Sequence, residues 1–98
     1  SNNTWYLNKE DTVVIGYTSA ESVVYLPASP KEGQVIFVKQ WWRGYMRFRP
    51  RSGYLIYDDT SVNDYYDFGE GQGGMFVYTV GYVDGVKKQV WLVSRWKY

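Results

Sequence analysis

Histidine and cysteine are both absent from this sequence of 98 residues. Their absence excludes the Ser-His-Asp and Cys-His nucleophile systems, zinc sites built from the usual ligands, and disulfide bonds. A catalytic site in this chain would have to work with carboxylates, tyrosine, lysine or arginine alone. We therefore expect a protein that is not an enzyme and that carries no cofactor and no metal ion.

The sequence also lacks an excess of charge of one sign and any long apolar run. Eleven Lys and Arg residues against ten Asp and Glu residues give a net charge of +1, so no overall field attracts nucleic acid or an anionic membrane. No run of about 18 apolar residues is present, and no charged segment followed by an apolar one opens the chain. We expect neither nucleic-acid binding nor membrane insertion.

Aromatic residues are plentiful, with five Trp, eleven Tyr and four Phe. Residues 1–98 are the size of a single domain with a thin core. The chain starts at Ser1 without an initiator Met, which suggests either a processed end or the C-terminal part of a longer chain. The absence of cysteine is compatible with either side of a membrane.

Short alternating apolar runs separated by turn residues, with no stretch at helical period, predict an all-β fold. The predicted strands are 12–17, 22–26, 34–39, 45–49 and 54–57, and the polar, acidic, glycine-rich segment 58–74 is the longest irregular piece. In the strand 45–49, Tyr45, Arg47 and Arg49 share one face. We expect a small antiparallel β-sandwich of about eight short strands.

A hairpin closes the predicted fold. Val83-Asp84-Gly85-Val86 has the pattern of a two-residue type I′ turn, which pairs Tyr78 with Trp91 on one face and Val77 with Leu92 on the other. Both faces are largely apolar, which is unusual for a hairpin on the outside of a small domain. Either this hairpin is central in a sandwich, or another copy of the chain covers one of its faces.

A basic segment lies close in sequence to an acidic one. The basic residues are Lys39, Arg43, Arg47, Arg49 and Arg51, and the acidic residues are Asp58, Asp59, Asp64, Asp67 and Glu70. Pairing of arginine with carboxylate, within the chain or between chains, is the interpretation that we favour over sugar binding and over nucleic-acid binding. The acidic loop does not match the EF-hand spacing, and its acids lie together in one loop, whereas a glycosidase requires two acids that flank a cleft.

Aromatic residues beside charges mark the candidate ligand site. Trp41 and Trp42 are adjacent, so on a strand they would face opposite sides, and we expect one indole in the core and the other at the surface. If a ligand binds, the chemistry that this composition favours is stacking of an aromatic ring on a saccharide, with Arg and Asp hydrogen-bonding its hydroxyls. The candidate residues are Trp41, Trp42, Arg43, Tyr45, Asp64, Tyr65 and Tyr66.

Spaced motifs over residues 12–96 give the chain a resemblance to a known family. An apolar strand ending in Leu26-Pro27 is followed by a turn and by Gly33-Gln34-Val35-Ile36-Phe37-Val38-Lys39. A Pro50-Arg51-Ser52-Gly53 turn follows, and Val90-Trp91-Leu92-Val93 closes the pattern. This sequence resembles a β module at the C-terminal ends of bacteriophage tail fibres and related phage structural, receptor-binding proteins. It departs from that pattern at residues 40–48, where such modules carry a small polar turn.

The resemblance implies a non-enzymatic domain exposed on the virion or extracellular surface, usually a homotrimer. Such a domain forms the structural tip of a fibre, or attaches to glycans on the host surface, or does both. Self-association and a cell-surface glycan are therefore the expected partners. The alternative is a monomeric carbohydrate-binding or adhesin module of a bacterial cell-surface protein.

Overall fold

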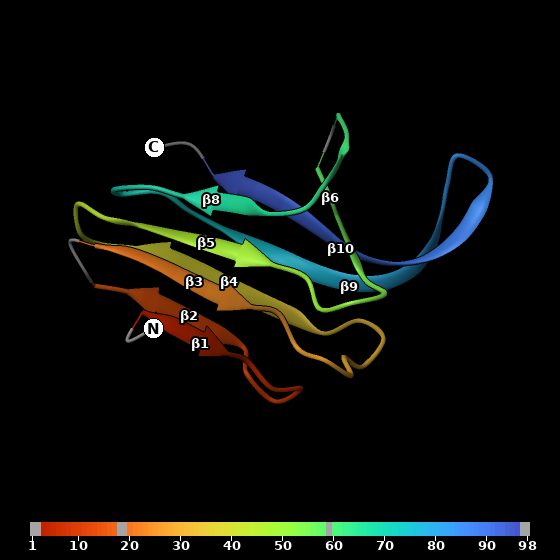
Figure 1. The fold of residues 1–98 in the computed structure, drawn as a ribbon, viewed down its shortest axis with the longest axis horizontal. Coiled ribbons are helices and arrows are strands. Elements are labelled where there is room, and N and C mark those ends of the chain that lie inside the picture. The colour runs from red at the N-terminus through yellow and green to blue at the C-terminus, as the bar shows by residue number, and fades with distance from the viewer. Residues whose placement is uncertain (1–2, 18–19, 59, 97–98) are drawn as a thin grey trace.

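The structure is a computed structural model that describes residues 3–17, 20–58 and 60–96. These residues form ten strands in two sheets, packed face to face as a β-sandwich (Figure 1). The four-stranded sheet has the order β1 (Thr4–Tyr6), β3 (Glu21–Tyr25), β5 (Tyr45–Arg49), β8 (Tyr66–Phe68). The six-stranded sheet has the order β2 (Val13–Gly16), β4 (Val35–Gln40), β9 (Gly73–Val83), β10 (Val86–Trp96), β6 (Leu55–Tyr57), β7 (Val62–Asn63).

The predicted all-β sandwich is confirmed, whereas the expected antiparallel pairing is wrong for part of both sheets. The pairs β1–β3, β3–β5, β2–β4 and β6–β10 are parallel. From β1 to β6 each successive strand belongs to the other sheet, so the chain runs forward in one layer and back in the other. Two strands that follow one another within the same sheet, such as β3 and β5, therefore run parallel.

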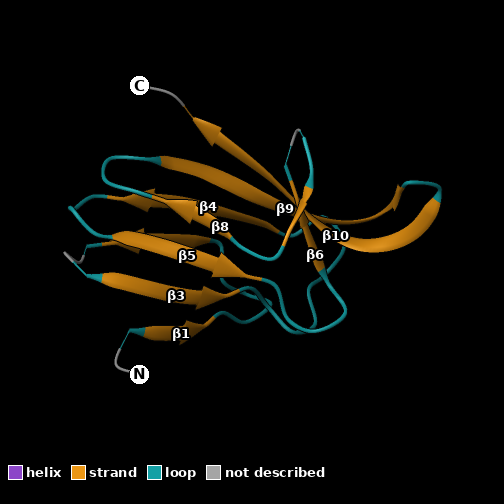
Figure 2. Ribbon diagram, turned by 45° about the horizontal axis from the view of Figure 1, so that its top comes forward, coloured by secondary structure: helices purple, strands orange, loops and turns teal. Residues whose placement is uncertain are grey.

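Strand number also differs from the expected eight. The three-residue strand β1 is too short for its alternation to be recognised in the sequence. The segment 58–74, expected to be irregular, contains β7, β8 and the first residues of β9. β8 pairs with β5 and so extends the four-stranded layer, which Figure 2 shows in front of the longer strands of the other sheet.

The closing hairpin matches its prediction in register and in turn geometry. Tyr78 lies opposite Trp91 and Val77 lies opposite Leu92. Asp84 and Gly85 have φ angles of 53° and 80°, both positive as a type I′ turn requires. The tip of the hairpin extends beyond the sandwich at the right of Figure 1, and the molecule measures 40 × 26 × 20 Å.

The core lies between the two sheets and is largely aromatic. Phe48 of the four-stranded sheet packs edge-on to Phe68 and tilts against Phe76 of the other sheet, with ring centroids 5.7 and 4.9 Å apart. Trp91 is completely buried and packs against Phe76 and Tyr78. Because these residues point inward, their neighbours in sequence point outward and form the two outer faces of the molecule.

Candidate functional site

Both tryptophans of the candidate ligand site are exposed, so the expectation that one indole enters the core is wrong. β4 ends at Gln40, and Trp41 and Trp42 lie in the connection that crosses to β5, where strand alternation does not apply. Their exposed fractions are 58% and 42%. The Trp42 ring lies 5.7 Å from that of Tyr17, and the Arg43 guanidinium lies 5.4 Å from the centre of the Trp42 ring.

The predicted pairing of arginines with carboxylates is found at one arginine. Nε of Arg47 donates to Oδ1 of Asp67 at 3.0 Å, and Nη2 donates to Oδ2 at 3.1 Å. This hydrogen bonding raises the pKa of the Arg47 guanidinium. Asp59, one of the expected partners, lies outside the described residues. Within the described ranges this is the one ion pair, and the other arginines lie mainly against aromatic rings.

Tyrosines and arginines alternate on the outer face of the four-stranded sheet, which we call the Tyr/Arg face. Strand register places Tyr6 beside Tyr25 and Tyr25 beside Arg49. The rings of Tyr6 and Tyr25 are stacked, with centroids 4.9 Å apart and planes 6° apart. The tyrosines and arginines of this face are Tyr6, Tyr25, Tyr45, Arg47, Arg49, Arg51 and Tyr65, and register also places Glu21 beside Tyr45 and both Val23 and Asp67 beside Arg47.

The guanidinium groups of the Tyr/Arg face lie over tyrosine rings. Arg47 lies 3.9 Å from the centre of the Tyr65 ring, and Arg49 lies 5.5 Å from the same ring. Arg51 lies 5.2 Å from the centre of the Tyr6 ring. Partial burial raises the pKa of the Tyr45 phenol, and its hydrogen bond to Glu21 raises that pKa further. The face is therefore an ordered array of rings and cations.

The structure does not bring the candidate ligand residues together in one site. Tyr45 and Tyr65 belong to the Tyr/Arg face, and Asp64, which precedes Tyr65, is exposed. Tyr66 instead packs at the rim of the core against Phe68 and Phe76. Trp41, Trp42 and Arg43 lie in the β4–β5 connection, beside the other sheet.

Sequence reasoning did not select Tyr6, Tyr25, Arg49 or Arg51 as site residues. The alternation of Tyr45, Arg47 and Arg49 was the available signal, because it places these three residues on one face of a strand. Tyr6 and Tyr25 join that face only through the parallel register of β1, β3 and β5.

The outer face of the six-stranded sheet is apolar across five strands. One row of neighbouring residues, from β4 to β7, consists of Val35, Val77, Leu92, Tyr57 and Val62. The corresponding inward residues, such as Ile36, Phe76 and Ile56, are completely buried. Both faces of this sheet are therefore apolar, as the hairpin pattern predicted for its central strands.

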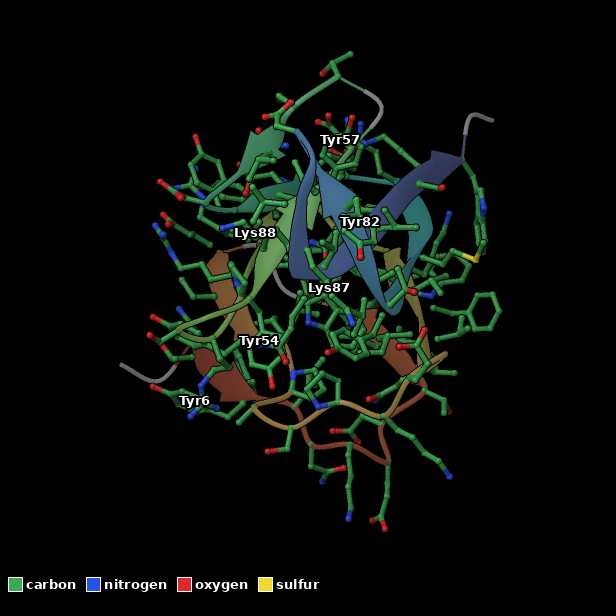
Figure 3. The ribbon with its side chains drawn as sticks, turned by 90° about the vertical axis from the view of Figure 1, so that its right-hand side faces the viewer. Tyr6, Tyr54, Tyr57, Tyr82, Lys87 and Lys88 are labelled. Atoms are coloured by element: carbon green, nitrogen blue, oxygen red, sulfur yellow. The ribbon has the colours of Figure 1, made fainter. Side chains whose placement is uncertain are left out.

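The apolar outer face continues to both ends of the sheet. On β2, Val13 lies beside Phe37, whose ring is 6.1 Å from that of Trp96. At the other end, a groove of about 360 Å³ is lined by Tyr57, Tyr82 and other residues of β6, β9 and β10. Figure 3 shows these two tyrosines, with Tyr82 beside Lys87 on the projecting hairpin and Tyr6 at a distance, at the lower left.

The edge strands β1 and β2 leave the sandwich open on one side. A cleft of about 480 Å³ lies there, lined mainly by apolar residues that include Trp5, Val13 and Ile15. The Ser22 hydroxyl also lines this cleft and is buried without a hydrogen-bond partner. Strand edges with apolar side chains are prone to association with another chain.

The first carboxylate of the acidic loop, that of Asp58, accepts hydrogen bonds that hold the loop together. Oδ1 of Asp58 accepts hydrogen bonds from the backbone N–H groups of Thr60 and Ser61 at 2.8 and 2.9 Å, and Oδ2 accepts one from Asn63 at 3.0 Å. The backbone hydrogen bonds lower the pKa of the Asp58 carboxyl. Within residues 3–17, 20–58 and 60–96, no group of three acidic side chains is placed to hold a metal ion.

Comparison with known proteins gives no assignment for this chain. No protein-family model matches the sequence, and a search of curated proteins finds no match either. In the described part of the chain, no helix has the length and apolar character needed to cross a membrane. The resemblance to phage tail-fibre modules stays a hypothesis.

Proposed function

We propose that this protein is a non-enzymatic domain of a phage tail fibre or a similar surface appendage, located on the virion or extracellular surface. In this proposal it assembles as a homotrimer, forms the structural tip of the appendage and attaches to host-surface glycans. The observation that carries the proposal is the apolar outer face of the six-stranded sheet, because exposed apolar patches of this kind mark interaction surfaces. The trimeric state itself comes from the family resemblance.

The size of the apolar face supports a stable interface. Full exposure of an aromatic side chain corresponds to about 150–250 Å², so the exposed parts of this face leave on the order of 800 Å² of apolar-rich surface. The exposed side chains are Val13, Ile15, Phe37, Val62, Leu92 and Trp96 of this sheet, together with Tyr17 and Trp41, which directly follow β2 and β4. A monomer exposes patches of about 300–600 Å², whereas a standard interface buries about 800 Å² on each partner.

A second copy of the chain is the occupant that fits these observations. Val13 and Ile15 lie on an edge strand, so a neighbouring subunit can cover the outer face and the open side of the sandwich together. A domain of this size also gains stability by burying apolar surface between subunits. Repetition of one interface around an axis gives a closed ring of subunits.

Two substitutions of the same kind test this assembly. Val13→Glu places a charge in the proposed interface, and Val86→Glu places it at the hairpin tip, where the valine is similarly exposed (58% and 53%). We expect sedimentation velocity to show an assembled wild type, an assembled Val86→Glu variant and a monomeric, folded Val13→Glu variant. An assembled Val13→Glu variant or a monomeric wild type would contradict the proposed interface.

The Tyr/Arg face favours a second candidate, the monomeric carbohydrate-binding or adhesin module. This alternative shares the ligand-binding role and differs in leaving the apolar face without a copy of the chain. A monomeric wild type that still binds a saccharide is the result that supports it.

A further inference from the structure

We propose that the Tyr/Arg face is a binding site for an acidic saccharide, one that carries carboxylate groups. This inference rests on the proposed function only in taking attachment to a surface saccharide as the role of the domain. It names the face, the residues and the chemical class of the ligand. The site lies on the outside of the four-stranded sheet, opposite the proposed subunit interface (Figure 2).

The charge of the face points to an anionic ligand. Arg47 is neutralised by Asp67, but among the described residues no carboxylate forms an ion pair with Arg49 or Arg51. Both guanidinium groups instead lie over tyrosine rings, at 5.5 and 5.2 Å from the ring centres. A guanidinium stacked on a ring keeps the N–H donors along its edge available, and their fork matches the two oxygens of a carboxylate.

The rings of the face point to a saccharide as the carrier of that carboxylate. Tyr6 and Tyr25 form a stacked pair beside Arg49, and the Tyr6 side chain is well exposed. An exposed aromatic side chain offers an apolar surface to the C–H groups of a sugar ring and a hydroxyl to its polar groups. A cation next to this platform can bind a carboxylate on the same sugar or on the next one.

Arg47 has a positioning role in this site. Its bidentate pair with Asp67 fixes the guanidinium 3.9 Å from the centre of the Tyr65 ring. Tyr65 is thereby held beside Arg49, although it lies outside β8. The site is therefore formed before a ligand arrives, and little ordering is needed on binding.

Single-stranded nucleic acid is the competing ligand for a face of rings and arginines. It requires several phosphate contacts and a strongly positive surface, whereas the whole chain has a net charge of +1. Arg49 and Arg51 supply two cations that form no ion pair with the residues that the structure describes, which suits one or two carboxylates better than a phosphate backbone.

Titration of the full chain with matched probes tests the site. We would measure binding of 3′-sialyllactose and a galacturonate tetramer by calorimetry, with lactose and the methyl-esterified tetramer as neutral counterparts. An oligothymidylate is the nucleic-acid probe. We expect at least one acidic saccharide to bind at least about tenfold more tightly than its neutral counterpart, because the arginines recognise its charge.

Substitutions of single cationic residues test where the acidic saccharide binds. Arg49→Gln and Arg51→Gln should each weaken binding of the acidic saccharide about tenfold, whereas Lys87→Gln, on the projecting hairpin, should leave it unchanged. Circular dichroism verifies that each variant is folded. The proposal is wrong if neither acidic saccharide is preferred to its neutral counterpart, if oligothymidylate binds more tightly than both, or if folded Arg49→Gln and Arg51→Gln variants bind as well as the wild type.

The outcomes for the site and for the assembly are separable, because the mass of the same samples is measured independently. A monomer that binds the acidic saccharide overturns the assembly and leaves the site intact. An assembled protein that binds none overturns the site alone.

Discussion

At the scale of single residues, Gly74 shows how closely the strands approach one another. A Cβ atom at this position would overlap the backbone carbonyl oxygen of Ser94 and lie 2.9 Å from the Phe68 ring. Gly74 lies in the same strand as Gly81, where a Cβ would have no neighbour within 4 Å. In β9, close packing therefore requires glycine at position 74 but not at position 81.

We predict that Gly74→Ala destabilises the fold by about 1–3 kcal/mol, because the backbone of β10 and the core must move to accommodate the added methyl group. Gly81→Ala, the matched control, should change the free energy of unfolding by no more than about 0.5 kcal/mol. Urea denaturation of both variants measures the difference. Equal stability of the two variants would mean that β9 and β10 do not approach at Gly74 as described.

Single residues also show where sequence reasoning fails. The alternation that places Met46 and Phe48 inside and Arg47 outside β5 holds because these residues lie within one regular strand. Trp41 and Trp42 lie one and two residues beyond the end of β4, so the same rule does not apply to them. The alternation rule fails here because both tryptophans lie outside the strand, in the connection to β5, and both indoles are exposed.

At the scale of elements, the hairpin is predictable from sequence and the sheet order is not. Asp84-Gly85 gives a local signal for the turn, and once the turn is placed the pairing of β9 with β10 follows. The connections that cross between sheets have no comparable signal. Pro, Ser and Gly in residues 27–33 indicate a loop, but they do not distinguish a hairpin from a connection to the other layer. The parallel pairs were therefore not foreseen.

The loop between β6 and β7 gives a prediction about pH. Because backbone hydrogen bonds lower the pKa of Asp58 below its ordinary value of 3.8, the folded protein binds this proton less tightly than the unfolded chain. The stabilisation is fully present above about pH 4 and is lost as the pH falls through the lowered pKa.

We predict that Asp58→Asn lowers the free energy of unfolding at about pH 7 by at most about 1 kcal/mol, since the carboxylate is only partly buried. The difference between wild type and variant should shrink as the pH falls below about 4. Urea denaturation at a series of pH values measures this difference. A difference that stays constant or grows toward acid pH would show that the carboxylate does not stabilise the loop through its charge.

At the scale of the whole molecule, the two outer faces have opposite characters. The face of the six-stranded sheet is apolar from Val35 to Val62, and the face of the four-stranded sheet combines tyrosine with arginine. The sequence predicted the apolar hairpin and the alternation in β5, but neither complete face. A face is a property of sheet order and register, so it becomes visible only when strands distant in sequence lie side by side.

We propose that the two faces have separate roles: the apolar face joins subunits and the Tyr/Arg face binds the ligand. A subunit interface on the apolar face leaves the Tyr/Arg face free, because the two lie on opposite sides of the sandwich. Salt weakens association of subunits through apolar surfaces very little, whereas it screens the charges and so weakens association through surface ion pairs.

The most direct test is the mass of the wild-type protein in solution, measured by light scattering coupled to size exclusion at several ionic strengths. We predict a mass near three times the 11.5 kDa of the chain, with little dependence on salt. A mass of 11.5 kDa at every protein concentration and ionic strength would contradict the claim that copies of this chain cover the apolar face.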